Sequence, residues 1–246
     1  MAPYFGATGY AWPMTTLLHA VGRYAEAHPH PSGLTPTPIP GLAVARATEP
    51  SGLMHAVSQP MVCLVVQGSK QVTTGTQSFA FSAGDSLLIT ADVPTVNQIT
   101  RASAAAPYLS LVLALDLAVV ADLAVQMDPE PEGRHAPVRV DTTEAEVVDA
   151  ALRLVRLLDR PAAVPVLQAA LVRELHYWLL AGRHGAAIRR LGWPDGHAPR
   201  VAKAVAVLRV EFAQTLPVER LAAVAGMSPS SFHQHFRSQT SLSPLQ

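Results

Sequence analysis

The feature that most constrains the fold of this chain is a change in its hydrophobic period near residue 116. Between residues 42 and 115, apolar residues form short, β-branched runs separated by turn residues such as Gly68-Ser69, Gly75 and Gly84-Asp85. Beyond Asp116 the apolar residues recur at helical spacing. Because strands repeat every two residues and helices every 3.6, the sequence predicts an α+β protein with its strands first. Many short strands with regular turns are typical of a sandwich or barrel, and we expect a cupin-like jelly roll.

The strands are expected over residues 42–47, 61–67, 71–74, 77–81, 86–90, 96–101 and 108–115. A helix is expected over residues 14–27, and another begins at the N-cap residue Asp116 and ends at Met127. Thr143 and Glu146 have the spacing of a capping box before a helix that reaches Leu158. A further helix covers residues 166–180, and residues 182–199 form a linker. The last two helices either pack on each other and on the barrel or form a dimerisation surface.

The composition of the chain limits which partners it can bind and in which cell compartment it can reside. The chain has 246 residues, of which 49% are hydrophobic, and its net charge of zero gives no global sign of nucleic acid binding. From Arg200 onward, however, five basic residues face only two acidic ones. The single cysteine excludes an internal disulfide, and Asp116 and Asp122 interrupt the most apolar segment. We therefore expect a bacterial, cytoplasmic protein with no membrane span, whose true start is either Met1 or Met14.

The C-terminal stretch AAVAGMSPSSFHQHF predicts two short helices around a tight turn. The first helix ends at Gly226, a residue type that tolerates a left-handed backbone, and Ser228 with Pro229 suits the start of the second. Phe232 and Phe236 are one turn apart and are expected to pack against the small residues of the first helix. This is the pattern of a helix-turn-helix. An ordinary helical hairpin is the alternative.

If the pair is a helix-turn-helix, its second helix enters the major groove. The residues that point away from the two phenylalanines then read the DNA. Ser230, His233 and Gln234 are expected at base edges, since glutamine can pair with adenine and histidine can donate to guanine. Arg237, Ser228 and Ser231 are better placed for phosphate.

The segment LAAVAGMSPSSFHQHFRSQTSLSPLQ resembles the first helix-turn-helix of AraC-family transcriptional regulators. Upstream, TPIPGLAVARATEP, MVCLVVQGSKQV, FSAGDSLLITADVP, PYLSLVLALD and RELHYWLLAG resemble the cupin-type N-terminal domain of one AraC subgroup. The resemblance covers residues 37–246. It implies an effector-sensing domain, a homodimer, DNA as partner and RNA polymerase as a further partner. Two departures are Ser241, where the family has glycine, and the absence of a second helix-turn-helix, which suggests a fragment.

The expected organisation has four parts. Residues 1–36 are an extension and helix, and residues 37–128 form the cupin-like sensing domain. Residues 129–196 form a helical dimerisation and linker region, and residues 197–246 form the first half of a DNA-binding domain.

The effector is a small molecule of unknown identity, and Cys63, His55 and Tyr108 are its candidate contacts. Cys63 is either a buried apolar residue or a thiol that senses aldehydes or oxidants. Asn97 and Gln98 are further candidates for the barrel lumen.

An enzyme, a metal site and a cofactor are not expected. The His-x-His pairs lie at His28 and His30, in a proline-rich loop, and at His233 and His235, on a helix. Residues two apart on a helix do not share a face, so they chelate one metal poorly. Two alternatives to a DNA-binding regulator are a truncated ligand-binding and dimerisation module without effective DNA contact and, less favoured, a cupin enzyme.

Overall fold

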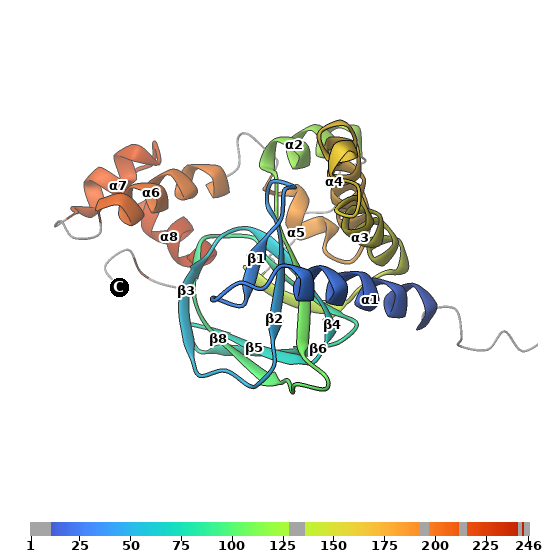
Figure 1. The fold of residues 1–246 in the computed structure, drawn as a ribbon. Coiled ribbons are helices and arrows are strands. Elements are labelled where there is room, and N and C mark those ends of the chain that lie inside the picture. The colour runs from blue at the N-terminus through green and yellow to red at the C-terminus, as the bar shows by residue number, and fades with distance from the viewer. Residues whose placement is uncertain (1–10, 128–135, 192–196, 212–215, 241–242, 244–246) are drawn as a thin grey trace, which may run out of the picture.

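The computed structural model describes residues 11–127, 136–191, 197–211, 216–240 and 243 (Figure 1). Its strands are β1 (Leu34–Pro36), β2 (Leu42–Ala47), β3 (Met54–Ser58), β4 (Met61–Gln67), β5 (Ser69–Thr74), β6 (Gln77–Ser82), β7 (Asp85–Ile89), β8 (Val93–Arg101), β9 (Tyr108–Ala114) and β10 (Val138–Thr142). Its helices are α1 (Ala11–Ala27), α2 (Leu117–Gln126), α3 (Ala145–Leu157), the 3-10 turn η1 (Pro161–Ala163), α4 (Val164–Ala181), α5 (Gly185–Arg189), α6 (His197–Glu211), α7 (Val218–Val224) and α8 (Pro229–Thr240).

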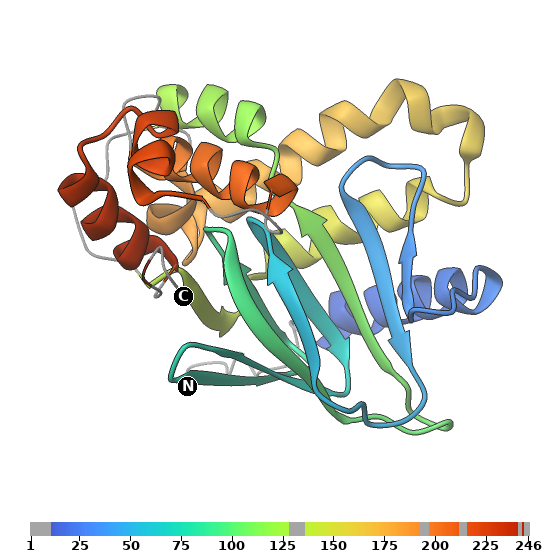
Figure 2. The same cartoon turned by 90° about the vertical axis from the view of Figure 1, so that its left-hand side faces the viewer.

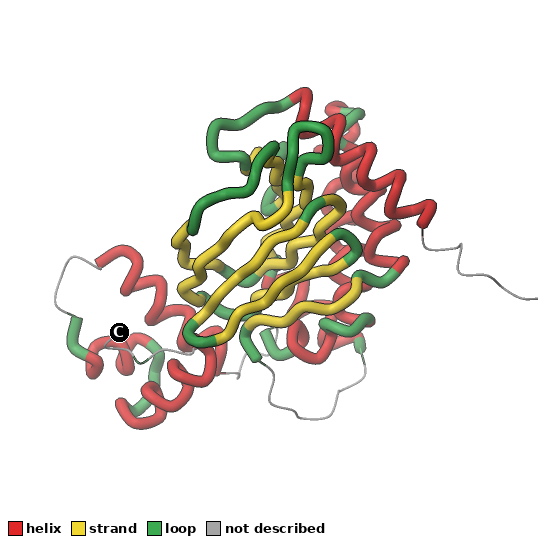
Figure 3. Tube along the Cα trace, turned by 90° about the horizontal axis from the view of Figure 1, so that it is seen from below, coloured by secondary structure: helices red, strands yellow, loops and turns green. Residues whose placement is uncertain are grey.

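The strands form two antiparallel sheets that enclose an apolar interior. The six-stranded sheet has the order β1-β2-β9-β4-β7-β10, and the four-stranded sheet has the order β3-β8-β5-β6. Every pairing is antiparallel. The predicted α+β fold with a cupin-like N-terminal barrel is confirmed (Figure 3).

The central strands of the six-stranded sheet are buried on both faces. On β4, Cys63 and Val65 belong to the barrel interior, whereas Val62, Leu64 and Val66 pack on the helices. Because neither face meets water, the strand reads as a continuous apolar run rather than an alternating one. Cys63 and Leu64 therefore point to opposite faces of the sheet.

A layer of helices covers the outer face of this sheet. Helix α1 packs on β2, β9 and β4 and also against α3, which in turn packs against α4 (Figure 2). The apolar stripe of α3 and its C-cap, from Val147 to Leu158, is buried. On α4, Leu175 and Leu179 are buried, but Leu167 is 47% exposed.

The structure contains elements that the sequence analysis did not predict. Strands β1, β3 and β10 are short, and β10 pairs with β7 through Val140 and Leu87. Helix α5 lies within the segment expected to be a linker, and its Ile188 is fully buried.

The expected capping box at the start of α3 is wrong. The N-cap is Glu144, and no side chain caps the helix there. The Glu144 carboxylate instead accepts a hydrogen bond from the backbone N–H of Arg183 at 2.7 Å, so the start of α3 is tied to the end of α4. By contrast, the predicted N-cap Asp116 accepts hydrogen bonds from the N–H groups of Ala118 and Val119.

Candidate nucleic-acid interface and barrel interior

A tight turn joins α7 to α8. Gly226 has a φ of 60°, a left-handed conformation that glycine adopts without strain, and its N–H donates to the Ala223 carbonyl at 2.9 Å. The N–H of Met227 donates to the Ala222 carbonyl at 2.9 Å. These two bonds satisfy the last carbonyls of α7 and end the helix at the predicted residue.

Ser228 begins helix α8. Its hydroxyl accepts a hydrogen bond from the N–H of Ser231 at 3.3 Å, and its carbonyl accepts from the N–H of Phe232 at 2.8 Å. Pro229 is the first residue of the helix, where its missing N–H costs no hydrogen bond.

Phe232 and Phe236 hold α8 against the two preceding helices. Phe232 is 0% exposed, and the two rings lie 5.3 Å apart in a tilted arrangement. They share a core with residues of α6 and α7 and of the turn, namely Val201, Ala204, Val205, Leu221, Ala222 and Ala225. The unit is therefore a three-helix structure, in which α6 packs against both α7 and α8.

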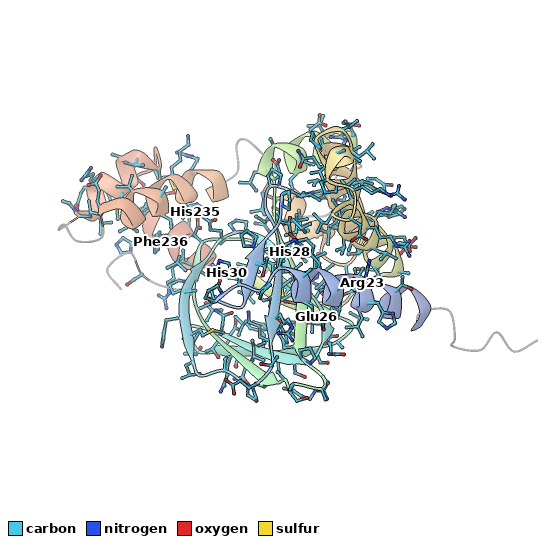
Figure 4. All side chains as sticks on the ribbon, viewed as in Figure 1. Arg23, Glu26, His28, His30, His235 and Phe236 are labelled. Carbon is cyan, nitrogen blue, oxygen red and sulfur yellow. The ribbon has the colours of Figure 1, made fainter. Side chains whose placement is uncertain are left out.

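The residues predicted to contact DNA do not belong to this core. Ser228, Ser230, His233, Gln234 and Arg237 are exposed, and Ser231 is half-buried. Figure 4 labels Phe236, whose side chain belongs to the core, together with its neighbour His235. The structure thus brings the predicted residues together on one solvent-facing surface, which we call the α8 surface.

Two arginines of this unit have structural partners that the sequence did not reveal. The Arg200 guanidinium donates to the Ala225 carbonyl at 2.9 Å and so holds the turn in place. Arg220 forms two bonds with the Glu211 carboxylate, at 2.7 and 2.8 Å. Lys203 and Arg237 are exposed cations of the same unit. The side chain of Arg209 and the residue Ser241 lie outside the described part of the chain.

The candidate effector residues are divided between two places. Cys63 and Tyr108 are each 1% exposed inside the barrel, with Sγ and Oη 3.9 Å apart. Burial, together with the neighbouring thiol, raises the pKa of Tyr108 well above its usual value. His55 is exposed on β3, where it pairs with Val96, and does not join them.

The two amide candidates are half-buried on β8. Asn97 donates to the Thr95 hydroxyl at 2.9 Å, and Gln98 donates to the Ser51 carbonyl at 3.4 Å.

Two buried histidines, missed by the sequence analysis, connect distant elements. His184 Nε2 lies 2.8 Å from the Ser86 hydroxyl, and its Nδ1 lies 3.4 Å from the Asp141 carboxylate. This is the order of groups in a hydrolase triad, but Ser86 and His184 are each 1% exposed, so a substrate does not reach them. These contacts of His184 connect the start of α5 to Ser86 on β7 and to Asp141 on β10. His176 similarly joins α4 to the start of α2.

A metal site and a membrane-spanning helix each place requirements on the described ranges. There, no group of three or more histidine, cysteine, aspartate or glutamate residues could hold a metal ion. None of the helices described is both long and apolar enough to cross a membrane.

These features define a class: a cupin-like barrel with a helical layer, followed by a three-helix unit whose last two helices are joined by a tight turn. Residues 38–187 match the model of the AraC-type transcriptional regulator N-terminus. Because this match covers more than half of the chain, the protein belongs to the AraC family of transcriptional regulators.

Solved structures resemble the chain distantly. The apo form of a ToxT variant from Vibrio cholerae is 8% identical, with a TM-score of 0.45, over 83% of this chain and 96% of that chain. The AraC-like transcriptional activator CuxR is 13% identical, with a TM-score of 0.42, over 83% and 73%. A cupin-2 domain protein from Shewanella frigidimarina is 12% identical, with a TM-score of 0.29, over 41% and 97%. Among curated proteins, none matches the chain.

Proposed function

We propose that this protein is a sequence-specific DNA-binding regulator that responds to a small effector in its N-terminal domain. The observation that carries the proposal is the α8 surface. Its polar residues Gln234, His233 and Arg237 face solvent, while Phe232 and Phe236 fix the helix from behind. A helix held in this way presents its side chains to a groove with little loss of conformational entropy on binding.

The part of the DNA that each α8 residue contacts depends on the position of that residue along the helix. Residues near the N-terminus of a recognition helix reach base edges, so Ser230, His233 and Gln234 read sequence. Arg237 lies a further turn along and contacts phosphate, with the hydroxyls of Ser228 and Ser231. The N-terminus of α8 adds its own attraction for phosphate.

The test compares two substitutions on α8 with a matched control. Duplexes that bind the protein are first selected from a random-sequence library, and binding is then measured against scrambled duplexes at several salt concentrations. Gln234→Ala should reduce discrimination between the two by about 1–3 kcal/mol. Arg237→Ala should weaken binding to both and lower the salt slope by about 1. Arg160→Ala removes an equal charge from an exposed position elsewhere and should change neither quantity.

A second candidate function is a ligand-binding and dimerisation module without effective DNA contact. It is favoured by exposed apolar side chains on α4 and α2, where Val166 is 76%, Tyr177 40% and Val125 86% exposed. If no duplex is selected, or if Arg237→Ala and Arg160→Ala behave alike, this candidate replaces the first.

The same apolar side chains support a homodimer in either case. Burying them against a second copy would remove apolar surface from water, at about 25 cal/mol per Å². Sedimentation velocity should show a dimer for the unmodified chain and a monomer for Val166→Glu. The exposed Val57 on β3 provides the control, since Val57→Glu should leave the dimer intact.

Regulation would then follow from the arrangement of the four expected parts, residues 1–36, 37–128, 129–196 and 197–246. An effector bound in the second part shifts the population of dimer arrangements set by the third, and so changes how two α8 surfaces reach their half-sites. The setting for this activity is the bacterial cytoplasm, with RNA polymerase as a further partner.

A further inference from the structure

Two buried hydroxyls inside the barrel have no hydrogen-bond partner. Ser110 Oγ, on β9, belongs to a side chain that is 1% exposed, and Thr74 Oγ1, on β5, to one that is 4% exposed. Ser110 pairs with Val65, a residue of the interior cluster, so it faces the interior too. A buried hydroxyl without a partner costs about 1–3 kcal/mol, which favours a ligand that satisfies it.

The Tyr108 phenol is close to Ser110 and is also poorly satisfied. Its neighbour is the Cys63 thiol at 3.9 Å, and sulfur is a weak acceptor. Ser110 lies close enough to the phenol to lower the pKa of Tyr108 as a hydrogen-bonding neighbour would, but the pair does not meet the geometry of a normal hydrogen bond. Because burial keeps the phenol protonated, Tyr108 and Ser110 are two neutral O–H donors without a good acceptor.

The surroundings of these donors are apolar. The interior cluster contains aliphatic and aromatic residues from both sheets, including Val72, Phe81, Leu87, Ile89 and Ile99. Lys70 occupies an inward register position opposite Phe81 and Ile99 but is only half-buried. An ionic ligand next to Ser110 would therefore be desolvated among neutral groups, at a large free-energy cost.

We propose that the barrel interior binds an uncharged, mainly apolar molecule whose carbonyl or hydroxyl oxygen accepts hydrogen bonds from Tyr108 and Ser110. The proposal rests on the effector-responsive function above and specifies the chemical class of the effector. It differs from the sensing of electrophiles by Cys63, because it requires no covalent bond to the thiol.

The experiment uses four probes that share one aromatic skeleton: acetophenone, toluene, benzoate and benzylammonium. Binding to the full chain is followed by the NMR shifts of valine and isoleucine methyl groups, which report on the interior through Val65 and Ile99. Acetophenone should bind more tightly than toluene, and the two ions should leave the interior methyl groups unshifted. Ser110→Ala and Tyr108→Phe should each weaken acetophenone about fivefold to tenfold, with little effect on toluene.

Ser103→Ala, in the exposed loop before β9, is the control and should change none of these affinities. Equal binding of benzoate or benzylammonium would overturn the proposal, as would equal affinities of acetophenone and toluene. The absence of interior shifts with all four probes would overturn it as well. These outcomes are independent of the DNA measurements on Gln234 and Arg237, so a failure of the effector class is distinguishable from a failure of the DNA-binding function.

Discussion

His176 is held in its neutral form by two backbone contacts. Its Nδ1–H donates to the Val172 carbonyl at 2.8 Å, and its Nε2 accepts from the N–H of Asp116 at 3.0 Å. A proton on Nε2 would remove the acceptor that the Asp116 N–H needs. Burial also lowers the pKa of His176, since the charged ring would lose its hydration.

This arrangement predicts a loss of stability in acid. The native pKa lies below that of the unfolded chain, so the unfolded chain binds more protons. The contribution of His176 is fully present above about pH 6.5 and decreases as the pH falls toward the native pKa. His176→Leu should lower the free energy of unfolding at pH 8 by about 1–3 kcal/mol and reduce the slope of stability below pH 6.5.

Urea unfolding between pH 5 and 8 measures both effects. The exposed His19 supplies the control, because His19→Leu removes a histidine but leaves both contacts of His176 in place. An unchanged slope in His176→Leu would contradict the assigned role of the ring.

The residues that shape α8 and the turn before it could be predicted from the sequence, but the histidine contacts could not. Ser228, Phe232 and Gly226 follow local rules of helix starts, helix faces and turns, which involve neighbours within a few positions. His184 and Ser86 are separated by 98 positions and His176 and Asp116 by 60, so only the fold brings them together. Ser110 is similar, because its lack of a partner depends on the opposite sheet.

At the scale of the elements, the turn between β4 and β5 depends on a glycine. Gly68 has a φ of 83°, and a Cβ atom there would lie 2.5 Å from the Arg101 carbonyl oxygen and 3.0 Å from the Tyr108 Cα. Gly84, before β7, has a φ of 94° but has nothing within 4 Å of such an atom. A side chain at Gly84 would therefore meet backbone strain alone, whereas a side chain at Gly68 would meet both strain and steric overlap.

Alanine at these positions should therefore have unequal effects. Gly84→Ala should cost about 1–2 kcal/mol, the penalty for a side chain in a left-handed conformation. Gly68→Ala should cost about 1–3 kcal/mol more, because the Arg101 carbonyl must also move. Urea midpoints of the two variants test this difference, and equal values would show that the turn relaxes freely.

The bounds of an element were predictable where its hydrophobic pattern continued over several residues without interruption. Strands β2 and β4 have the bounds expected from the sequence. Strand β10 was missed because it is short and follows a proline-rich segment, although its Val-Arg-Val-Asp alternation is a weak signal of a strand. Helix α5 was missed because glycines at positions 182 and 185 favour a loop, whereas the burial of Ile188 against the helical layer overrides that preference.

At the scale of the whole molecule, the apolar cores are separate. The barrel interior and the helical layer share the six-stranded sheet, so residues such as Val65 and Leu64 stabilise two cores through one strand. The core around Phe232 contains residues from Val201 onward only. The C-terminal unit meets the barrel where α8 lies near β8.

Separate cores predict separate unfolding transitions, since cooperativity follows shared packing. Phe232→Ala should destabilise the C-terminal unit by about 3–5 kcal/mol and shift one calorimetric transition to lower temperature. Leu154→Ala, in the fully buried stripe of α3, should destabilise the barrel and helical layer by about 2–5 kcal/mol and shift the other transition. Val224→Ala, at a position that is 37% exposed on α7, is the control and should shift neither transition by more than a small amount. If Phe232→Ala moved both transitions together, the contact between α8 and β8 would have to couple the two units, and the C-terminal unit would then be part of the same cooperative structure as the barrel.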